Sequence, residues 1–512
     1  MANGQRGGRF RPRVTLAPRY THKQIPGLPE GAMVVTNTER KDLHCPRRWW
    51  YSRGLGLQSP ASGAMRFGSS FDTVMEGILD WYRLHPDEGP ITMEVVQDGP
   101  LQGVVDSILQ AEDLYPDGVD REITRLTRAV EGWVHTYAQA MGEDYRVLDA
   151  QPMIAVPITS PTTGKVYRSK VPVVTTPDGW RLATAMDSQE EVSLVTLPWF
   201  QLTKLDGVVL HRGEGTVWAW ETKTSGNPEG YSRDLHLDTQ LPGYTRALWY
   251  ATQVLGLYGG RRVGGYVWDV TSSQEHRDPR VLSSGRLSTA SGQRVPSWRW
   301  RMALDAALGD SWTVQTVRAE VSRLQSVLVD LEAEAAKWTE AAKVMGRGSA
   351  GAPARTSRDA AREAVKIARE TLAPLQDALE LDAMVQTAME TVDPSLYVRR
   401  WGEFSTHALV QYEVELFQDA VRIGQHLRRA VETSSAIPSG SPESTVPTDL
   451  DLQVALHFPR VPICRTPGGF CPYTGPCLQD GEVVRSNYES RSTVRWLNTN
   501  SAQEWSWDGE EA

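Results

Sequence analysis

The sequence predicts an α/β fold that carries an inserted antiparallel helical hairpin. Three observations support this prediction. Residues 40–150 show the three- and four-residue spacing of apolar side chains that is typical of helices. Residues 150–270 are rich in Val, Thr, Trp and Tyr and contain turn sequences such as "TPDG" and "HRGEG", which favours strands. Residues 313–345 repeat apolar side chains in heptads, which favours a long helix packed against another helix.

Composition indicates an ordinary soluble protein of 512 residues, with 40% hydrophobic and 23% charged residues. The length allows about three domains at ~150 residues each. The formal charge of -9 argues against a protein that simply coats nucleic acid, although an acidic enzyme can concentrate basic groups in a groove. The chain has no run close to the ~20 apolar residues of a membrane span and no apolar signal core at its N-terminus. We therefore expect a cytoplasmic protein with no membrane partner.

The first 39 residues are expected to form a flexible arm. This segment contains several arginines among glycines: Arg6, Arg9, Arg11 and Arg13. A solubilising tail and a DNA-contacting arm both agree with this composition, and the sequence does not separate the two.

Two predicted strands carry the candidate site. The first, "WFQLTKLDGVVL" (residues 199–210), ends in the turn "HRGEG", and the second, "VWAWETKTSG", covers residues 217–226. Side chains alternate along a strand, so Glu221 and Lys223 share one face and Thr222 points to the other. If the hairpin turns at Gly213 and Glu214, Asp206 lies opposite Glu221, whereas a slip of one residue would separate them.

Two carboxylates that converge beside water suit a hard divalent cation such as Mg²⁺, which takes oxygen ligands and keeps several waters. Such a cation activates water and stabilises charge on a phosphate, while a lysine orients the nucleophile or neutralises the phosphate. The alternative is a surface salt bridge between Glu221 and a cross-strand cation. The Glu-x-Lys tripeptide is common, and by itself it favours this alternative.

The order of three motifs resembles that of the PD-(D/E)XK nucleases, specifically the RecB-like exonuclease branch. The motifs are "LDGVV", "VWAWETKT" and "DTQLPGY", and the last begins a predicted helix with Pro242 in its first turn. The resemblance implies a restriction-endonuclease-like core, in which helices flank a central mixed sheet. It also implies a metal site of Asp206, Glu221 and the Thr222 carbonyl for Mg²⁺ or Mn²⁺, with Lys223 assisting the attacking water. Gln240 and Tyr244, one helical turn apart, would position DNA.

One position departs from this pattern. The branch usually carries a metal-binding His in an early helix, and "FGSSFDTVMEG" has Asp72 there. Asp72 could be an oxygen ligand of the metal, or it could be an acid near a helix N-terminus with no role in metal binding.

The four cysteines suggest one metal centre. Cys464, Cys471 and Cys477 lie within 14 positions, and Cys45 stands far from them in "LHCPRRWWY". The number is too low for a disulfide scaffold, and the absence of C-x-x-C pairs argues against a zinc ribbon. Four thiolates can hold a [4Fe–4S] cluster.

The cysteine layout also resembles that of iron–sulfur RecB-like nucleases, including the AddB nuclease domain and CRISPR-associated exonucleases. These have one Cys before the nuclease motifs and three after them, although the six-residue gap after Cys464 is longer than usual. The resemblance implies a cluster that joins the two ends of the nuclease domain. "DPRVLSSGRLSTAS" further resembles a segment of viral RecB-like nucleases and suggests a phage-type homologue.

We therefore expect five segments: an arm (1–39), a nuclease core (40–310), an inserted helical hairpin (311–390), C-terminal helices with the cysteine segment (391–480), and a tail (481–512). The expected activity is metal-dependent exonucleolytic hydrolysis of DNA, single-stranded or at duplex ends, in recombination, repair or phage DNA metabolism. The alternative is a nuclease-like DNA-binding or assembly protein that acts with a helicase or recombinase partner and has little activity alone. The hairpin, as a surface for a partner helix, and Asp72 keep this alternative open.

Overall fold

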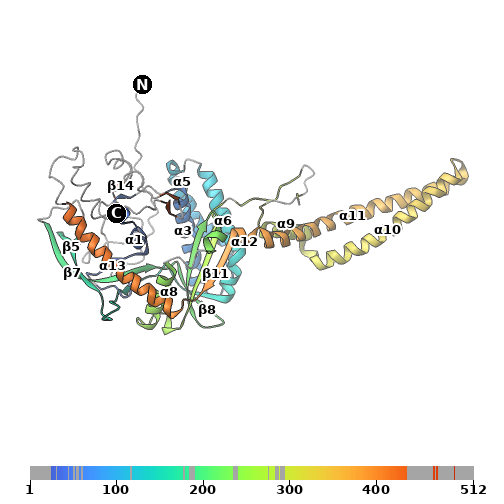
Figure 1. Ribbon diagram of the computed structural model, residues 1–512. Coiled ribbons are helices and arrows are strands. Elements are labelled where there is room, and N and C mark those ends of the chain that lie inside the picture. Colours follow the sequence, from blue (N-terminus) through green and yellow to red (C-terminus); the bar gives the residue numbers. More distant parts are fainter. Residues whose placement is uncertain are drawn as a thin grey trace, which may run out of the picture.

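The structure is a computed structural model of the chain (Figure 1). The residues that it describes are 25–29, 31–43, 45–49, 52, 57–58, 62–115, 118–176, 179–183, 191–233, 240–274, 276–282, 287–288, 294–434, 465–466, 469–470 and 489–490.

A five-stranded mixed sheet forms the centre of the fold, as the sequence predicted. Its strand order is β11-β10-β9-β8-β3. Strands β9 and β10 are parallel, and the other neighbouring pairs are antiparallel. The strands are β3 (Tyr145–Ala150), β8 (Gly207–His211), β9 (Val217–Ser225), β10 (Val263–Ser272) and β11 (Tyr397–Gly402).

Helices cover both faces of this central sheet. Helices α3 (Gly63–Leu84) and α6 (Val119–Asp144) bury their apolar sides with Trp218 and Trp220 of β9. Helix α8 (Gln240–Gln253) packs with Val217 and Ala219, which alternate with those tryptophans. Shorter helices complete the body: α1 (Asn37–Asp42), α2 (Pro46–Trp49), α4 (Met93–Val96), α5 (Gln102–Gln110), α7 (Pro228–Arg233) and α12 (Asp393–Leu396). In the described part of the chain, every helix is too short or too polar to cross a bilayer.

A second five-stranded sheet, which the sequence patterns do not predict, lies beside the first. Its apolar face packs against α13 (Thr406–Ser434), which runs across β5 and β7 in Figure 1. Strand β1 pairs in parallel with β7, so the N-terminal arm ends earlier than residue 39: the apolar run of β1 is buried in this sheet. The strands are β1 (Met33–Val35), β4 (Met153–Pro157), β5 (Arg168–Thr176), β6 (Gly179–Leu182) and β7 (Val192–Lys204).

The two sheets meet at a corner where two strands break at the same level. The segment expected as one strand over residues 199–210 is two strands, β7 and β8, separated by Leu205 and Asp206. Beside this break, β3 and β4 are separated by Gln151 and Pro152, and Gln151 has a φ of 51°. The Gln151 N–H donates to the Asp206 carbonyl at 2.8 Å. Strands that change sheets thus place Asp206 at the corner.

Two glycines allow helices to approach this corner closely. A Cβ on Gly207 would lie 3.2 Å from Leu79 of α3. A Cβ on Gly243 of α8 would lie 2.6 Å from the Tyr412 hydroxyl. Glycine inside a helix costs about 1 kcal/mol relative to alanine, and at Gly243 the close packing of α8 explains its presence.

The expected helical hairpin projects from the body as two long antiparallel helices (Figure 1). These are α10 (Val314–Met345) and α11 (Ala352–Thr391), and α9 (Ser297–Leu308) packs against their base. The predicted heptad positions Val317, Val321 and Leu324 are buried in this seam, whereas Met345 at its end is 53% exposed. The turn between the two helices is short, because α10 ends at Met345 and α11 begins at Ala352.

Candidate active site

The register between β8 and β9 places Asp206 next to Glu221. Gly207 pairs with Trp220 and Val208 with Ala219, which is the register that the sequence predicted. Asp206, one residue before Gly207, therefore lies across from Glu221. The Asp206 carboxylate accepts hydrogen bonds from the Thr222 backbone N–H at 2.8 Å and from the Thr222 hydroxyl at 3.1 Å. These two bonds fix Asp206 at the end of the paired segment.

Glu221 is buried, with only 1% of its surface exposed, so a surface salt bridge does not describe it. One of its carboxylate oxygens, Oε1, forms an ion pair with Lys223 and accepts from the Tyr244 hydroxyl at 3.1 Å. The other oxygen, Oε2, has no hydrogen-bond partner among the described residues. The pKa of Glu221 is raised to about 8: burial is the largest cause, the charge of Asp206 adds to the shift, and Lys223 opposes it.

Lys223 is the cation of the site, and 25% of its side chain is exposed. Its ammonium donates to the Thr222 carbonyl at 3.1 Å and lies 5.9 Å from the centre of the Trp268 ring. Burial disfavours the ammonium, yet the carboxylates of Glu221, Asp206 and Asp72 raise the pKa of Lys223 well above its usual value. Lys223 is therefore charged at neutral pH.

Asp72 lies in the middle of α3, ten residues into the helix, so it is not a helix N-terminal acid. It is close enough to Lys223 and Asp206 for their charges to act on it. The pKa of Asp72 is raised to about 7: burial is the largest cause, the charge of Lys223 opposes the shift, and Asp206 adds to it. The structure thus brings a third carboxyl group to the corner.

Helix α8 supplies two polar side chains on one face. The Gln240 amide donates to the Tyr244 hydroxyl at 3.4 Å, and Tyr244 in turn donates to Glu221. Burial, and next the charge of Glu221, raise the pKa of Tyr244 well above its usual value, so the phenol keeps its proton.

Two lysines near the site were missed by the sequence analysis. Lys41 of α1 donates to the Gln240 side-chain oxygen at 3.2 Å. Lys204, the last residue of β7, lowers the pKa of Asp72 through its charge. Lys204 precedes Asp206 by two positions, which was a usable signal, whereas no local pattern marks Lys41.

Comparison with known families places the segment that contains these residues in one superfamily. A sequence model of the PD-(D/E)XK nuclease superfamily matches residues 41–344, more than half of the chain. The chain belongs to the PD-(D/E)XK nuclease superfamily. The match includes Asp72, Asp206, Glu221, Lys223 and the start of α8. No curated protein matches the chain.

PD-(D/E)XK nucleases generally use Mg²⁺ or Mn²⁺, and the donor set at the corner fits such a cation. Glu221 offers a buried carboxylate oxygen that no described residue contacts by a hydrogen bond, and Asp206 lies across from Glu221. Within the described residues, no three His, Cys, Asp or Glu side chains are grouped closely enough to hold an ion by themselves. Asp206 and Glu221 supply two carboxylates, and Mg²⁺ is usually held by one or two carboxylates and keeps several waters.

The cysteines are only partly placed. Cys45 lies partly buried between α1 and α2, and it forms no disulfide with any residue that the structure describes. Cys464, Cys471 and Cys477 lie outside the described residues.

If Glu221 holds the cation, Glu221→Gln removes metal-dependent stabilisation. Mn²⁺ at about 100 times its Kd stabilises the native state by ~2.7 kcal/mol. We expect the unfolding midpoint of the wild type to rise with Mn²⁺ and fall back with EDTA, and that of Glu221→Gln to stay unchanged. Calorimetry measures both, and Glu229→Gln, an exposed site on α7, is the control. An equal rise in Glu221→Gln contradicts this assignment.

Proposed function

We propose that the chain is a metal-dependent DNA exonuclease of the RecB-like branch, which hydrolyses phosphodiester bonds at DNA ends. The observation that carries the proposal is the network of Asp206, Glu221, Lys223 and Tyr244 at one corner of the sheet. This network lies in the segment that matches a nuclease superfamily. Recombination, repair and phage DNA metabolism are the processes in which such an activity would act.

Asp206, Glu221 and the Thr222 carbonyl are the groups that would hold the cation, with Asp72 as a further oxygen donor. The bound cation would acidify a water molecule and stabilise the charge that develops on the phosphate. Tyr244 and Lys223 both contact Oε1 of Glu221, which leaves Oε2 free as a ligand. Water attacks the phosphorus directly, and the bond from phosphorus to the leaving sugar oxygen breaks without a covalent enzyme intermediate.

Lys223 acts as a charged donor in this proposal. Because its pKa is raised, it holds its proton at neutral pH and cannot serve as the general base. Its side chain is 25% exposed, so in the proposed enzyme it orients the attacking water or neutralises a phosphate oxygen.

Gln240, Tyr244 and Lys41 form a chain of hydrogen bonds that leads away from Glu221. In the proposed enzyme this chain positions the DNA strand. Lys41 adds a positive charge on this side of the site, which suits a phosphate next to the scissile one.

A cleavage assay tests the proposed activity. Removing one catalytic electrostatic group typically costs about 10²–10³-fold in rate. We expect Glu221→Gln and Lys223→Met to lose at least ~100-fold activity on end-labelled DNA with Mg²⁺ or Mn²⁺, while Glu229→Gln cleaves as the wild type does. Circular DNA should resist all of them.

Three outcomes would contradict the proposed site, the requirement for DNA ends, or the nuclease activity. Normal cleavage by Glu221→Gln would falsify the site. Cleavage of circular DNA at the rate of linear DNA would remove the requirement for ends. Folded wild type that binds DNA but does not cleave it would favour the DNA-binding or assembly protein that works with a helicase or recombinase partner.

We also propose that Cys45, Cys464, Cys471 and Cys477 hold a [4Fe–4S] cluster that joins the ends of the nuclease domain. Two strand pairings support this. Arg465 pairs with Phe470, and these are the chain neighbours of two of the cysteines. Strand β14 (Glu489–Ser490) pairs with β2 (Leu57–Gln58), which brings the chain after the cysteine segment back to the region that follows Cys45.

Iron analysis tests the cluster. After anaerobic purification we expect about four iron atoms per wild-type chain, with the brown colour of a [4Fe–4S] protein. In Cys45→Ser, which lacks one of the four thiolates, the iron content and the unfolding midpoint should both fall. Zinc in place of iron, or equal iron in the variant, contradicts the proposal.

A further inference from the structure

Charge is separated along the helical hairpin. Its distal half, residues 335–369, contains eight Lys and Arg and three Asp and Glu, a net charge of +5. The remainder of α10 and α11, residues 314–334 and 370–391, contains two Lys and Arg and nine Asp and Glu, a net charge of -7. In a chain with a formal charge of -9, the distal half is therefore a concentrated basic surface.

Five of the cations form a stripe along α11. Their spacings of three and four residues place them on one face of the helix. At a rise of 1.5 Å per residue the stripe is about 21 Å long. Its members are Arg355, Arg358, Arg362, Lys366 and Arg369.

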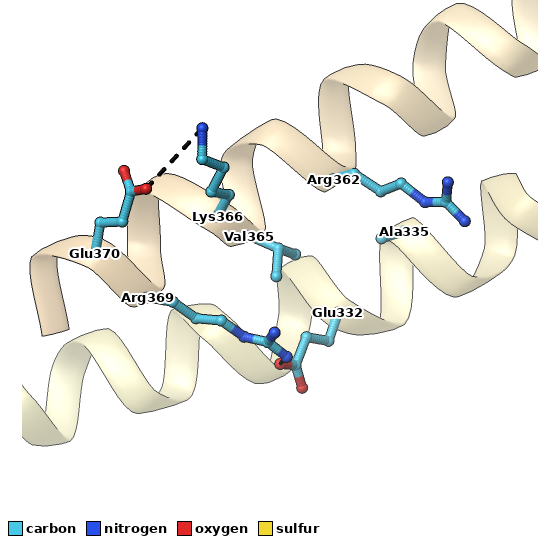
Figure 2. Close-up of a pocket in the computed structure, with 7 residues that line it drawn as sticks. All are labelled: Glu332, Ala335, Arg362, Val365, Lys366, Arg369 and Glu370. Carbon is cyan, nitrogen blue, oxygen red and sulfur yellow. Dashed lines mark hydrogen bonds and ion pairs between the residues drawn. The ribbon is translucent and has the colours of Figure 1, made fainter. Parts of the chain in front are cut away.

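The stripe borders a shallow hollow of about 390 Å³ between the two helices (Figure 2). Arg362 extends across it towards α10 and has no ion-pair partner among the described residues. Arg369 pairs with Glu332 at 2.6 Å, and Lys366 lies 3.6 Å from Glu363 and 4.0 Å from Glu370. The side chains of these pairs are 44% to 66% exposed, so the ion pairs can be exchanged for a ligand at little cost.

We propose that the distal half of the hairpin binds the backbone of duplex DNA, away from the active site. Duplex DNA carries one negative charge per ~1.7 Å, which complements a straight row of cations. Surfaces that bind single strands present aromatic side chains for base stacking. The distal half contains one aromatic residue, Trp338, which is partly buried in the seam and not on the stripe.

This inference rests on the proposed function, because it assumes that DNA is the substrate. The 32 residues of α10 span about 48 Å, so the basic surface lies well beyond the base of the hairpin. A duplex held there is anchored by its backbone without any demand on its sequence. We therefore infer that the substrate of the nuclease is a duplex that extends beyond the cleaved end and contacts the hairpin.

Salt-dependent binding of a labelled duplex of about 40 base pairs, in EDTA, tests the inference. Each phosphate contact contributes about 0.9 to the slope of log K against log salt concentration. In Arg362→Gln/Lys366→Gln we expect that slope to fall by about 1.8 and binding at low salt to weaken several-fold. The matched control, Arg318→Gln/Arg323→Gln in the acidic part of the hairpin, removes the same charge and should bind as the wild type does.

An unchanged slope in the Arg362/Lys366 variant overturns the inference. A slope that falls by the same amount in the Arg318/Arg323 control also overturns it. If the Arg362/Lys366 variant loses as much affinity for a single strand of the same length as for the duplex, the choice of duplex DNA is overturned. Cleavage of a short single-stranded oligonucleotide distinguishes failure of this inference from failure of the proposed nuclease function. The Arg362/Lys366 variant should cut that oligonucleotide normally, and Glu221→Gln should bind the duplex with the wild-type slope.

Discussion

The pairing of β8 with β9 is the constraint on which the site depends. It places Asp206 across from Glu221, and the two bonds from Thr222 to Asp206 hold that position. Because β7 and β8 belong to different sheets, the chain must turn at Leu205 and Asp206. The corner between the sheets is therefore both a structural necessity and the point at which the carboxylates are displayed. A slip of one residue in this register would dismantle the site.

The charged groups at this corner favour the binding of a cation. Burial is the largest cause that raises the pKa of Glu221 to about 8 and that of Asp72 to about 7, which means that the charged forms are costly there. Lys223 offsets part of this cost through one oxygen of Glu221, and the other oxygen has no hydrogen-bond partner in the part of the chain that the structure describes. Functional sites commonly retain such unfavourable groups, and a bound cation would relieve this one.

Sequence patterns predicted the parts of the fold that depend on local order. The period-two alternation of residues 217–226 was enough to place Glu221 and Lys223, and the turn at residues 213–214 was enough to give the register. The second sheet was missed because strand patterns do not reveal which strands pair, and the break at Leu205 was read as continuous strand. Lys41 was missed because it meets Gln240 only through the tertiary fold, across 199 positions of sequence.

The position at which a divalent cation binds tests the proposed site most directly. Crystals grown with Mn²⁺ and measured at a wavelength where manganese scatters anomalously would locate it. We predict an anomalous peak between the carboxylates of Asp206 and Glu221, on the side of Oε2. A well-ordered site with no peak there, or a peak at another group of residues, would contradict the account.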